Sequence, residues 1–511
     1  MVNILKTHWT FLSLLITFFL AVILRFLYFP NNIYFGFDQA RDSFTTLQLL
    51  SGHFKLMGPP TGVEGLFHGP LYYYLYAPFY LISYGDPVFA NGFLRVINSL
   101  GIFLIFLAGF AIFNKRVGLI AAFLFAISFE QTQYAMYFNH PSLGVISVTL
   151  FYLGLALLFF KKQQKGLTLA SLGLGLSLQF EFALIYLFGL SLLLLIIYRK
   201  QFFTVKKTTW LYSFIFLGLA LSSFILSEVR FHFRTFNHIS RIIGVGGGRG
   251  VTQLLNNIYI ILNRLVADNI ISYSWSSTLV LIVLIATVIA LIKNSKLRPK
   301  LIFLSLWILG GVIPYLNNKS ATPLYYYTMG AGVGLLILYS FFIDQVWNKQ
   351  RILAFILIAI PLISNVNLIK STNASGVIPT INVQSGMLLG DEKKVVDYIY
   401  KEASGRPFAI SGVTMPLFVN TTWDYLFEWY GKAKYGYLPV WGADAAAGYL
   451  GDLKIVSAKS ALPSTRFFII EPTRGIRQAL IENMLREESY FTKVVKEERI
   501  GGFIIQKREP I

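Results

Sequence analysis

Apolar stretches close to 20 residues long alternate with short polar segments throughout the first 369 residues. A helix of about 20 residues crosses the hydrocarbon core of a bilayer, so each stretch predicts a membrane-spanning helix. The shortest stretch, 167–180, could join 182–198 in one broken span. The eleven stretches that predict spans are 10–29, 91–113, 117–135, 142–160, 167–180, 182–198, 209–227, 272–292, 301–317, 323–343 and 352–369.

The chain changes character near residue 370, where the long apolar stretches end. Residues 370–511 contain 18 basic and 15 acidic residues, a balance typical of a water-exposed domain. We therefore divide the chain into a membrane domain, 1–369, and a small α/β domain, 370–511. The elements that the local patterns predict in the second part are a helix at 391–403, strands at 407–412 and 465–471, a helix at 475–488 and a hairpin turning at Gly501–Gly502.

Charge supports a membrane protein and predicts its orientation. Only 13% of the residues are charged, about half of the usual fraction, although the formal net charge is +20. Lys and Arg occupy every second loop, which predicts a cytoplasmic N-terminus and an extracytoplasmic C-terminal domain. The basic excess therefore indicates a bilayer, and not a nucleic acid, as the partner. We expect a multi-pass protein of the cell membrane, and the absence of cysteine excludes disulfides.

Carboxylates are rare in the first 369 residues, and the predicted topology places all but Asp344 at the outer face. Charged groups within membrane segments are costly and often functional. Asp86, Asp268 and Glu64 suit ordinary outer loops. Glu130, Glu181 and Glu228 lie at or near the outer ends of apolar stretches, where each is either a functional group or a solvated span end. Together the three suggest a polar cavity that opens outward.

The densest polar cluster lies in the predicted first outer loop, residues 30–90. Residues 38–50 are expected to be helical, which brings Asp38 and Asp42 to one face with Arg41 beside them. A capped surface helix with a salt bridge would have the same pattern. The aromatic segment 66–84, which carries His68 in the run His68-Gly69-Pro70-Leu71-Tyr72, predicts an interfacial or re-entrant helix.

These motifs resemble those of the GT-C superfamily of glycosyltransferases. A first span followed by F-D-x-A-R and then by [HK]-x-P-L-Y-Y is similar to prokaryotic homologues of dolichyl-phosphate-mannose–protein mannosyltransferase (glycosyltransferase family 39) and to lipid A aminoarabinose transferase. Weaker similarities are the Asn139-His140-Pro141 turn and the Pro323-Leu324-Tyr325-Tyr326-Tyr327 run. The resemblance covers about residues 10–345 and implies a polytopic α-helical GT-C-like fold with an outer C-terminal domain.

The resemblance also implies an activity. An inverting transferase would move one sugar, by default a mannose-like hexose, from a polyprenyl-phosphate carrier to an extracytoplasmic protein, glycolipid or polysaccharide. Asp38 matches the catalytic Asp of the first loop, and Arg41 matches an arginine that faces the donor phosphate. Many relatives have Asp-Glu where this chain has Asp38-Gln39, so Asp42 is the candidate second acid. Phe67 replaces the Glu that some relatives use as a metal ligand, so no metal ligands are assigned, although a divalent metal stays possible.

The residues themselves support the same chemistry. A departing lipid phosphate needs fixed cations, which Arg41, His68 and Arg95 could supply. An acceptor hydroxyl must lose a proton, which a partly desolvated Asp38 could accept, while Asp42 binds the acceptor or positions Arg41. The candidate sugar- and acceptor-binding residues are Asn139, His140, Gln179, Glu181, Glu228, Tyr325 and Tyr326. A glycine-rich stretch, Gly244–Gly250, and the nearby Arg230, His232, Arg234 and His238 could gate or complete the site.

Three other classes of function stay open. A lipid-sugar flippase or transporter would place polar groups at the bilayer midplane within inverted repeats, whereas here they cluster at one face and no repeat is visible. A polysaccharide polymerase or ligase would concentrate arginines in a large late loop. A scaffold would use only its outer domain, which the acid, arginine and histidine cluster in the first loop argues against.

Overall fold

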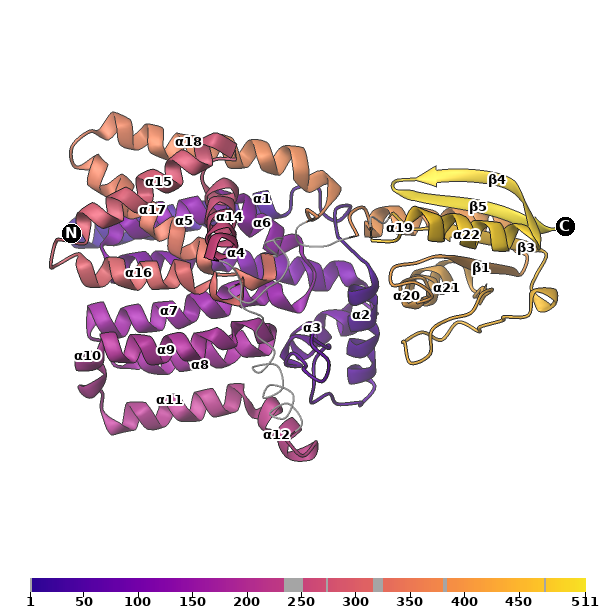
Figure 1. Ribbon diagram of the computed structural model, residues 1–511, viewed down its shortest axis with the longest axis horizontal. Helices are drawn as coiled ribbons and strands as arrows, with labels where there is room; N and C mark the ends of the chain where they lie inside the picture. The colour runs from indigo at the N-terminus through magenta and orange to yellow at the C-terminus, as the bar shows by residue number, and fades with distance from the viewer. Residues whose placement is uncertain (1, 234–250, 273, 316–324, 380–383, 473–474) are drawn as a thin grey trace.

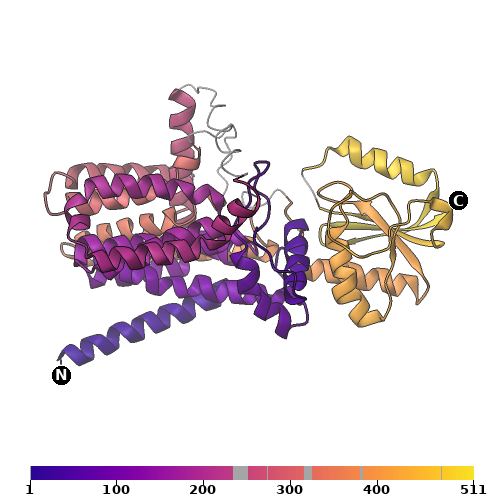
Figure 2. The ribbon, with the colours of Figure 1, turned by 90° about the horizontal axis from the view of Figure 1, so that it is seen from below.

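The computed structural model describes residues 2–233, 251–272, 274–315, 325–379, 384–472 and 475–511. A helical body comprises most of the chain and leads to a mixed α/β unit, and the two chain ends lie at opposite ends of the long axis (Figure 1). The view from below shows the same separation, with the N-terminal helix along the edge of the body (Figure 2).

The body is built almost entirely from α-helices joined by short turns. Its longer helices are α1 (Val2–Arg25), α2 (Phe37–Leu50), α3 (Leu71–Ile82), α4 (Pro87–Ile112), α5 (Lys115–Ile127), α6 (Phe129–Met136), α7 (Gly144–Lys161), α8 (Lys165–Phe180), α9 (Tyr186–Ile197), α11 (Lys207–Ala220), α12 (Ser222–Arg230), α14 (Val251–Asn269), α15 (Ser274–Leu291), α16 (Arg298–Gly310), α17 (Ala331–Trp347) and α18 (Arg351–Thr372). Short pieces connect them: η1 (His140–Leu143), η2 (Phe182–Ile185), α10 (Arg199–Phe203), η3 (Ile313–Tyr315), η4 (Tyr325–Tyr327) and η5 (Asn373–Ser375).

Several of these helices can cross a bilayer. Within the described residues, four helices have the length and apolar composition of a span, or five if the bent pair α11 and α12 is one span. Three shorter apolar helices, at Phe182–Ile197, Trp275–Leu291 and Ala331–Trp347, accompany them. The chain is thus a multi-pass membrane protein, while the eleven spans and their orientation stay predictions.

The α/β unit contains a five-stranded mixed sheet in the order β2-β1-β3-β5-β4. β1 pairs in parallel with β2 and β3, whereas β5 pairs antiparallel with β3 and β4. The strands β1, β3, β4 and β5 and the longer helices begin and end close to the predicted positions, whereas β2 was not predicted. The elements are α19 (Leu389–Ala403), β1 (Phe408–Val413), α20 (Thr421–Leu426), η6 (Phe427–Gly431), α21 (Lys432–Tyr435), β2 (Val440–Trp441), η7 (Lys459–Ala461), β3 (Thr465–Ile470), α22 (Gln478–Ser489), β4 (Thr492–Ile500) and β5 (Phe503–Pro510).

The α/β unit packs on the region of α2. The Tyr425 ring, from α20, lies 5.0 Å from the ring of Phe44 and 5.5 Å from that of Phe35. Its hydroxyl also donates to the carbonyl of Gly85 at 2.6 Å. Because Tyr425 is buried, this contact excludes water from the junction between the unit and the helix that carries Asp38.

Two buried arginines tie the first helices of the body together. Arg95 in α4 donates to the side chains of Asn91 at 2.7 Å and Asn32 at 3.0 Å, and to the carbonyl of Arg25 at 2.6 Å. Arg25 in turn donates to the side chain of Asn98 at 2.6 Å and to backbone carbonyls of α5. Within a bilayer such groups need protein partners, because no water is at hand to replace them.

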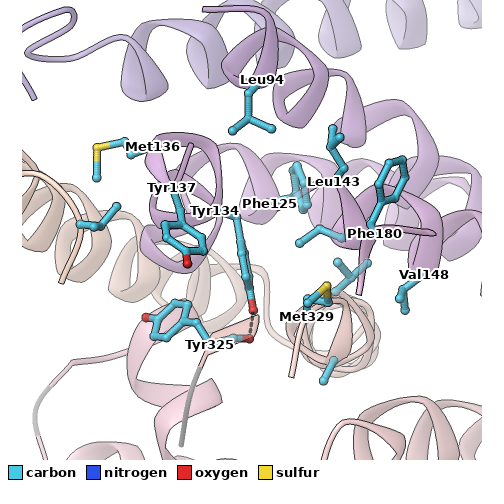
Figure 3. Packing of buried hydrophobic residues seen from close by; sticks show 14 of the residues in the cluster. Leu94, Phe125, Tyr134, Met136, Tyr137, Leu143, Val148, Phe180, Tyr325 and Met329 are labelled. Carbon is cyan, nitrogen blue, oxygen red and sulfur yellow. Dashed lines mark hydrogen bonds between the residues drawn. The ribbon is translucent and has the colours of Figure 1, made fainter. Parts of the chain in front are cut away.

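Nearer the centre of the body, aromatic side chains from α6 and η4 meet. The hydroxyl of Tyr134 donates to the backbone carbonyl of Tyr325 at 2.7 Å, and the ring of Tyr137 lies close by (Figure 3). This packing brings the late η4 segment against the early helices of the body.

The arginine network predicts a stability effect. Arg95→Met should lower the free energy of unfolding by about 3 kcal/mol, because it removes three charge-assisted hydrogen bonds and leaves their acceptors buried without partners. Thermal unfolding in detergent measures the loss. Lys394→Met is the control, since Lys394 pairs with Asp391 from an exposed position and should change stability by less than about 1 kcal/mol. A stable Arg95→Met protein with weakened donor binding would instead support a phosphate contact for Arg95.

Candidate functional site

The start of α2 is held by backbone and side-chain contacts that aim its first turn. The Gly36 amide donates to Oε1 of Gln39 at 3.1 Å, which caps the helix. The Gln39 amide group donates to the carbonyl of Phe138 at 2.8 Å. Gln39 thus joins the first turn of α2 to the turn that precedes Asn139. At this position, where many relatives have a second acid, this chain has a residue with a structural role.

Asp38, Arg41 and Asp42 form one ionic cluster on that turn. Arg41 donates through NH1 to Asp38 at 2.7 Å and through Nε to Asp42 at 2.8 Å. The side chain of Asp38 is 43% exposed, that of Arg41 18% and that of Asp42 10%. The hydroxyl of Tyr73 in α3 also donates to Asp42, at 3.1 Å. Asp42 is therefore the buried anchor of Arg41, whereas Asp38 faces open space.

That space is a cavity of about 610 Å³ at the end of the body next to the first loop. Six predicted site residues line it, and they come from four separate segments of the chain. Further residues that were not candidate site residues complete the lining, among them Pro141 and Tyr327 of the two motifs noted in the sequence. The predicted lining residues are Asp38, Arg41, His68, Asn139, His140 and Glu181, and the others include Thr61, Tyr137, Pro141, Phe182, Pro314 and Tyr327.

The surroundings of Asp38 suit a general base. The surrounding protein partly desolvates the Asp38 carboxyl and so raises its pKa above the usual value, and the neighbouring Arg41 opposes that rise. For Arg41, burial acts to lower the pKa, but the carboxylates of Asp42 and Asp38 raise it well above its usual value. The guanidinium therefore stays charged, while Asp38 is a stronger base than an exposed aspartate.

A close approach of two backbones positions His68. The Gly69 amide donates to the Gln179 carbonyl at 3.0 Å, and a Cβ on Gly69 would meet the Gln179 Cα at 2.7 Å. Only glycine lets the two segments come this near. His68 consequently lies beside the turn at Glu181, with its Nδ1 3.7 Å from a Glu181 carboxylate oxygen.

His68, His140 and Glu181 form a buried group that could hold a divalent metal ion. Their candidate ligand atoms all lie within 4.8 Å of one another, and the two imidazole rings are 4.1 Å apart. Burial, with His140 and Arg41 nearby, lowers the pKa of His68 well below its usual value, so this imidazole is neutral. Burial also raises the pKa of Glu181 to about 8. Two imidazoles and a carboxylate are a donor set typical of zinc.

Hydrogen bonds orient the three side chains. Nδ1 of His140 lies 2.5 Å from the carbonyl of Phe180, which leaves its Nε2 for a ligand. The Phe182 amide donates to Nδ1 of His68 at 3.1 Å, so a cation would use Nε2 or take the place of that amide. The Ala183 amide donates to Glu181 at 3.0 Å, which leaves further lone pairs on the carboxylate. The donor set therefore fits a cation after a small rearrangement around His68.

Other predicted site residues lie outside the cavity lining. Arg95 uses its guanidinium in the buried network described above, and its role toward the donor phosphate stays a prediction. Gln179 donates to Ser223 and to the carbonyl of Ala220, and Glu228 lies in α12. Tyr325 is buried and donates to Asp268 at 2.6 Å, and the side chain of Tyr326 is not among the described ones. The predicted gating stretch Gly244–Gly250, with Arg234 and His238, lies outside the described residues.

The structure adds a second ionic cluster that sequence reasoning missed. Arg264 and Asp268 of α14 lie 3.9 Å apart, and the guanidinium covers the Tyr325 ring at 4.4 Å. Asn269 donates to the Glu130 carboxylate at 3.0 Å. The available signal was an Arg and an Asp spaced i,i+4 in a stretch with no other charged residue. Glu130 is therefore an interior group of this cluster.

Comparisons with known proteins identify the fold. No protein-family model and no curated protein sequence matches the chain. The crystal structure of ArnT from Cupriavidus metallidurans bound to undecaprenyl phosphate matches with a TM-score of 0.59 and 12% identity, over 98% of each chain. Mycobacterial arabinofuranosyltransferase AftD matches with a TM-score of 0.50 and 12% identity, over 98% of this chain and 40% of that one.

The oligosaccharyltransferase of Archaeoglobus fulgidus, tethered with an acceptor peptide, also matches, with a TM-score of 0.50 and 13% identity. That match covers 82% of this chain and 63% of the archaeal chain, so the chain spans less than two thirds of that protein. This chain shares the fold of these three structures, and the similarity to ArnT runs along the whole length of both proteins.

The histidine and carboxylate group leads to a prediction about metal content. Protein incubated with Zn²⁺ and desalted should keep about one equivalent, and Glu181→Gln should lose it, because the substitution removes the anionic ligand. Inductively coupled plasma mass spectrometry measures the content, and visible spectra of the Co²⁺ form report the ligand geometry. Glu64→Gln, at an exposed position of the same outer loop as His68, is the control and should keep the metal. Equal retention by both variants would contradict a metal role for Glu181.

Proposed function

We propose that this protein is a polyprenyl-phosphate-dependent glycosyltransferase that transfers a single sugar with inversion. The observation that carries the proposal is the Asp38 and Arg41 pair, which opens into a cavity within a GT-C fold. A carboxylate and a fixed guanidinium on one helical turn supply the two groups that such a transfer needs. ArnT, which has this fold, was solved with undecaprenyl phosphate, and this supports a lipid phosphate as the leaving group.

The mechanism follows from the charges. The planar guanidinium of Arg41 suits two phosphate oxygens and stabilises the negative charge that builds up as the bond between the anomeric carbon and the phosphate breaks. A bound phosphate would compete with Asp38 for NH1, while Asp42 keeps its hold on Nε. Asp38 is then free to accept the proton of the acceptor hydroxyl as that oxygen attacks the anomeric carbon. A single displacement of this kind needs one base and inverts the configuration.

Asp42 and His68 have supporting roles in this proposal. Asp42 holds Arg41 in place and is itself held by Tyr73, so it is a positioning residue rather than a second base. His68 lines the cavity and, as a neutral imidazole, could donate a hydrogen bond to the donor phosphate. Asn139, His140 and Glu181 line the same cavity and are the candidate contacts to the sugar, to a metal or to the acceptor.

The cellular setting is part of the proposal. The distribution of Lys and Arg supports a plasma-membrane protein whose site faces the extracytoplasmic side, where the lipid-linked donor would also lie. A mannose-like hexose is the default sugar, and the acceptor is a protein, a glycolipid or a surface polysaccharide. The flippase and polymerase alternatives have no specific observation in their favour among the described residues.

The catalytic assignment predicts the effect of one substitution. Asp38→Asn should lower transfer about a thousandfold, because the amide cannot accept the acceptor proton, while donor binding changes little. Purified protein is incubated with labelled polyprenyl-phosphate monosaccharides and an envelope extract, and release of polyprenyl phosphate with sugar incorporation is measured. Glu64→Gln serves as the matched control and should keep full activity. An active Asp38→Asn enzyme would disprove the role of Asp38 as the base.

The raised pKa of Asp38 predicts a pH dependence. The base must be ionised, so kcat/KM should fall as the pH drops through that pKa, at a higher pH than for an ordinary aspartate near about 4. Arg41→Ala should move this acidic limb to still higher pH, because Arg41 holds the pKa of Asp38 down. Lys55→Ala, which removes another cation of the outer loop, should leave the limb unchanged. Initial rates across pH give the profiles, and identical limbs in all three proteins would refute the coupling.

A further inference from the structure

A second cavity, of about 200 Å³, lies within the C-terminal α/β unit and takes no part in the proposed transfer. Residues of β1, β2 and β3 form its floor, and α22 and the turn after it close one side. Aromatic and polar side chains share its lining: Ser411, Phe418, Trp441, Asp444, Ser457, Lys459, Phe468, Met484, Glu487, Glu488 and Phe491.

The cavity lies against the parallel part of the sheet, at the junction of β1 and β3. From β1 the chain leads to β2 on one side, whereas from β3 it leads to β4 and β5 on the other. The segment after β1 contributes Phe418 to the lining, and the segment after β2 contributes Asp444. Ser411 of β1 and Phe468 of β3 are register partners at this junction, and both line the cavity.

The chemistry of the lining selects the ligand. Three carboxylates face one lysine, which disfavours an anionic ligand such as a nucleotide or a free phosphate. Lys459 already has two partners, since it pairs with Glu488 at 2.7 Å and donates to the Gly442 carbonyl at 3.2 Å. Its charge is therefore largely neutralised within the protein. Phe418 and Phe491 are each 51% exposed at the edge. Aromatic faces beside hydroxyls and carboxylates suit a molecule with an apolar C–H face and a rim of hydroxyl groups.

The backbone at Phe418 supports a binding role. This residue has φ of 62°, a left-handed conformation that is rare and strained for an aromatic side chain. Such strain is commonly retained at ligand sites, where the surrounding structure holds it. The carbonyl of Phe418 accepts a hydrogen bond from the Ala446 amide at 2.8 Å, which fixes the loop against the next segment.

That next segment, residues 443–450, connects the cavity with the catalytic helix. Asp444 lines the cavity, and the ring of Tyr449 packs 5.6 Å from that of Phe37 at the start of α2. The Arg41 guanidinium lies over the same Phe37 ring at 5.5 Å. Five residues span at most about 18 Å, so Asp444 lies within that distance of Tyr449, which contacts the start of α2. A chain of sugar units bound here could extend toward Asp38.

We propose that this cavity binds a neutral sugar residue of a glycan acceptor, at a distance from the point of transfer. The inference rests on the proposed function for the role of acceptor, and it narrows the acceptor to a saccharide. Binding of the saccharide depends only on the residues that line this cavity. It can therefore be measured without sugar transfer at Asp38.

Saturation-transfer NMR on the full-length protein in detergent tests the proposal. The probes are methyl α-mannoside, cellobiose and N,N′-diacetylchitobiose. At least one should receive saturation from the wild type, and Phe491→Ala and Asp444→Asn should each weaken its binding by about tenfold. The matched controls are Tyr490→Ala and Asp452→Asn, which change exposed neighbours that do not line the cavity and should bind as the wild type does.

Two further measurements keep the outcomes separate. Asp38→Asn should bind the saccharide normally, and donor consumption is assayed on the same preparations. Saccharide binding through these residues without donor consumption would leave the subsite standing while the proposed function fails. Donor consumption without saccharide binding, equal binding by the lining and control variants, or preferential binding of a lysine-rich peptide would each overturn the subsite.

Discussion

The hold of two carboxylates on Arg41 is the interaction on which the candidate site depends. Asp42 is buried and anchored by Tyr73, so it keeps one edge of the guanidinium in place, while Asp38 engages the other edge at the cavity. A fixed cation in a site sheltered from water stabilises a departing phosphate far more than a mobile, solvated cation would. In the proposed transfer, Asp38 changes its protonation state while Arg41, on the same turn of helix, keeps its charge.

The rest of the body keeps this turn in position. Gln39 joins α2 to the turn before Asn139, and Gly69 lets the His68 loop lie against the backbone at Gln179. Beneath them, Arg25 and Arg95 connect α1, α4 and α5 with hydrogen bonds that only protein groups can supply at that depth. Burying these arginines costs desolvation free energy. Their hydrogen bonds to protein acceptors offset that cost and hold the helices beneath the site together.

The C-terminal unit belongs to the same arrangement. Tyr425 packs against Phe35 and Phe44 on either side of the first turn of α2, and Tyr449 packs against Phe37 within it. The unit thus contacts the helix that carries Asp38 through several aromatic side chains. A ligand held by this unit would be oriented relative to the helix that carries Asp38, and such orientation favours reaction.

Local patterns were sufficient for what depends on local physics. Apolar stretches predicted most long helices of the body, but not α14 or the break between α5 and α6. Local patterns predicted β1 and β3, and the spacing of Asp38, Arg41 and Asp42 predicted a shared helical face. Long-range contacts decided the rest. The sequence around an Arg at the end of a span is the same whether that Arg contacts a ligand or a protein carbonyl. Only the fold showed that Arg95 donates to the carbonyl of Arg25. His68, His140 and Glu181 lie far apart in the chain, and their meeting depends on how the loops pack, which no local spacing encodes.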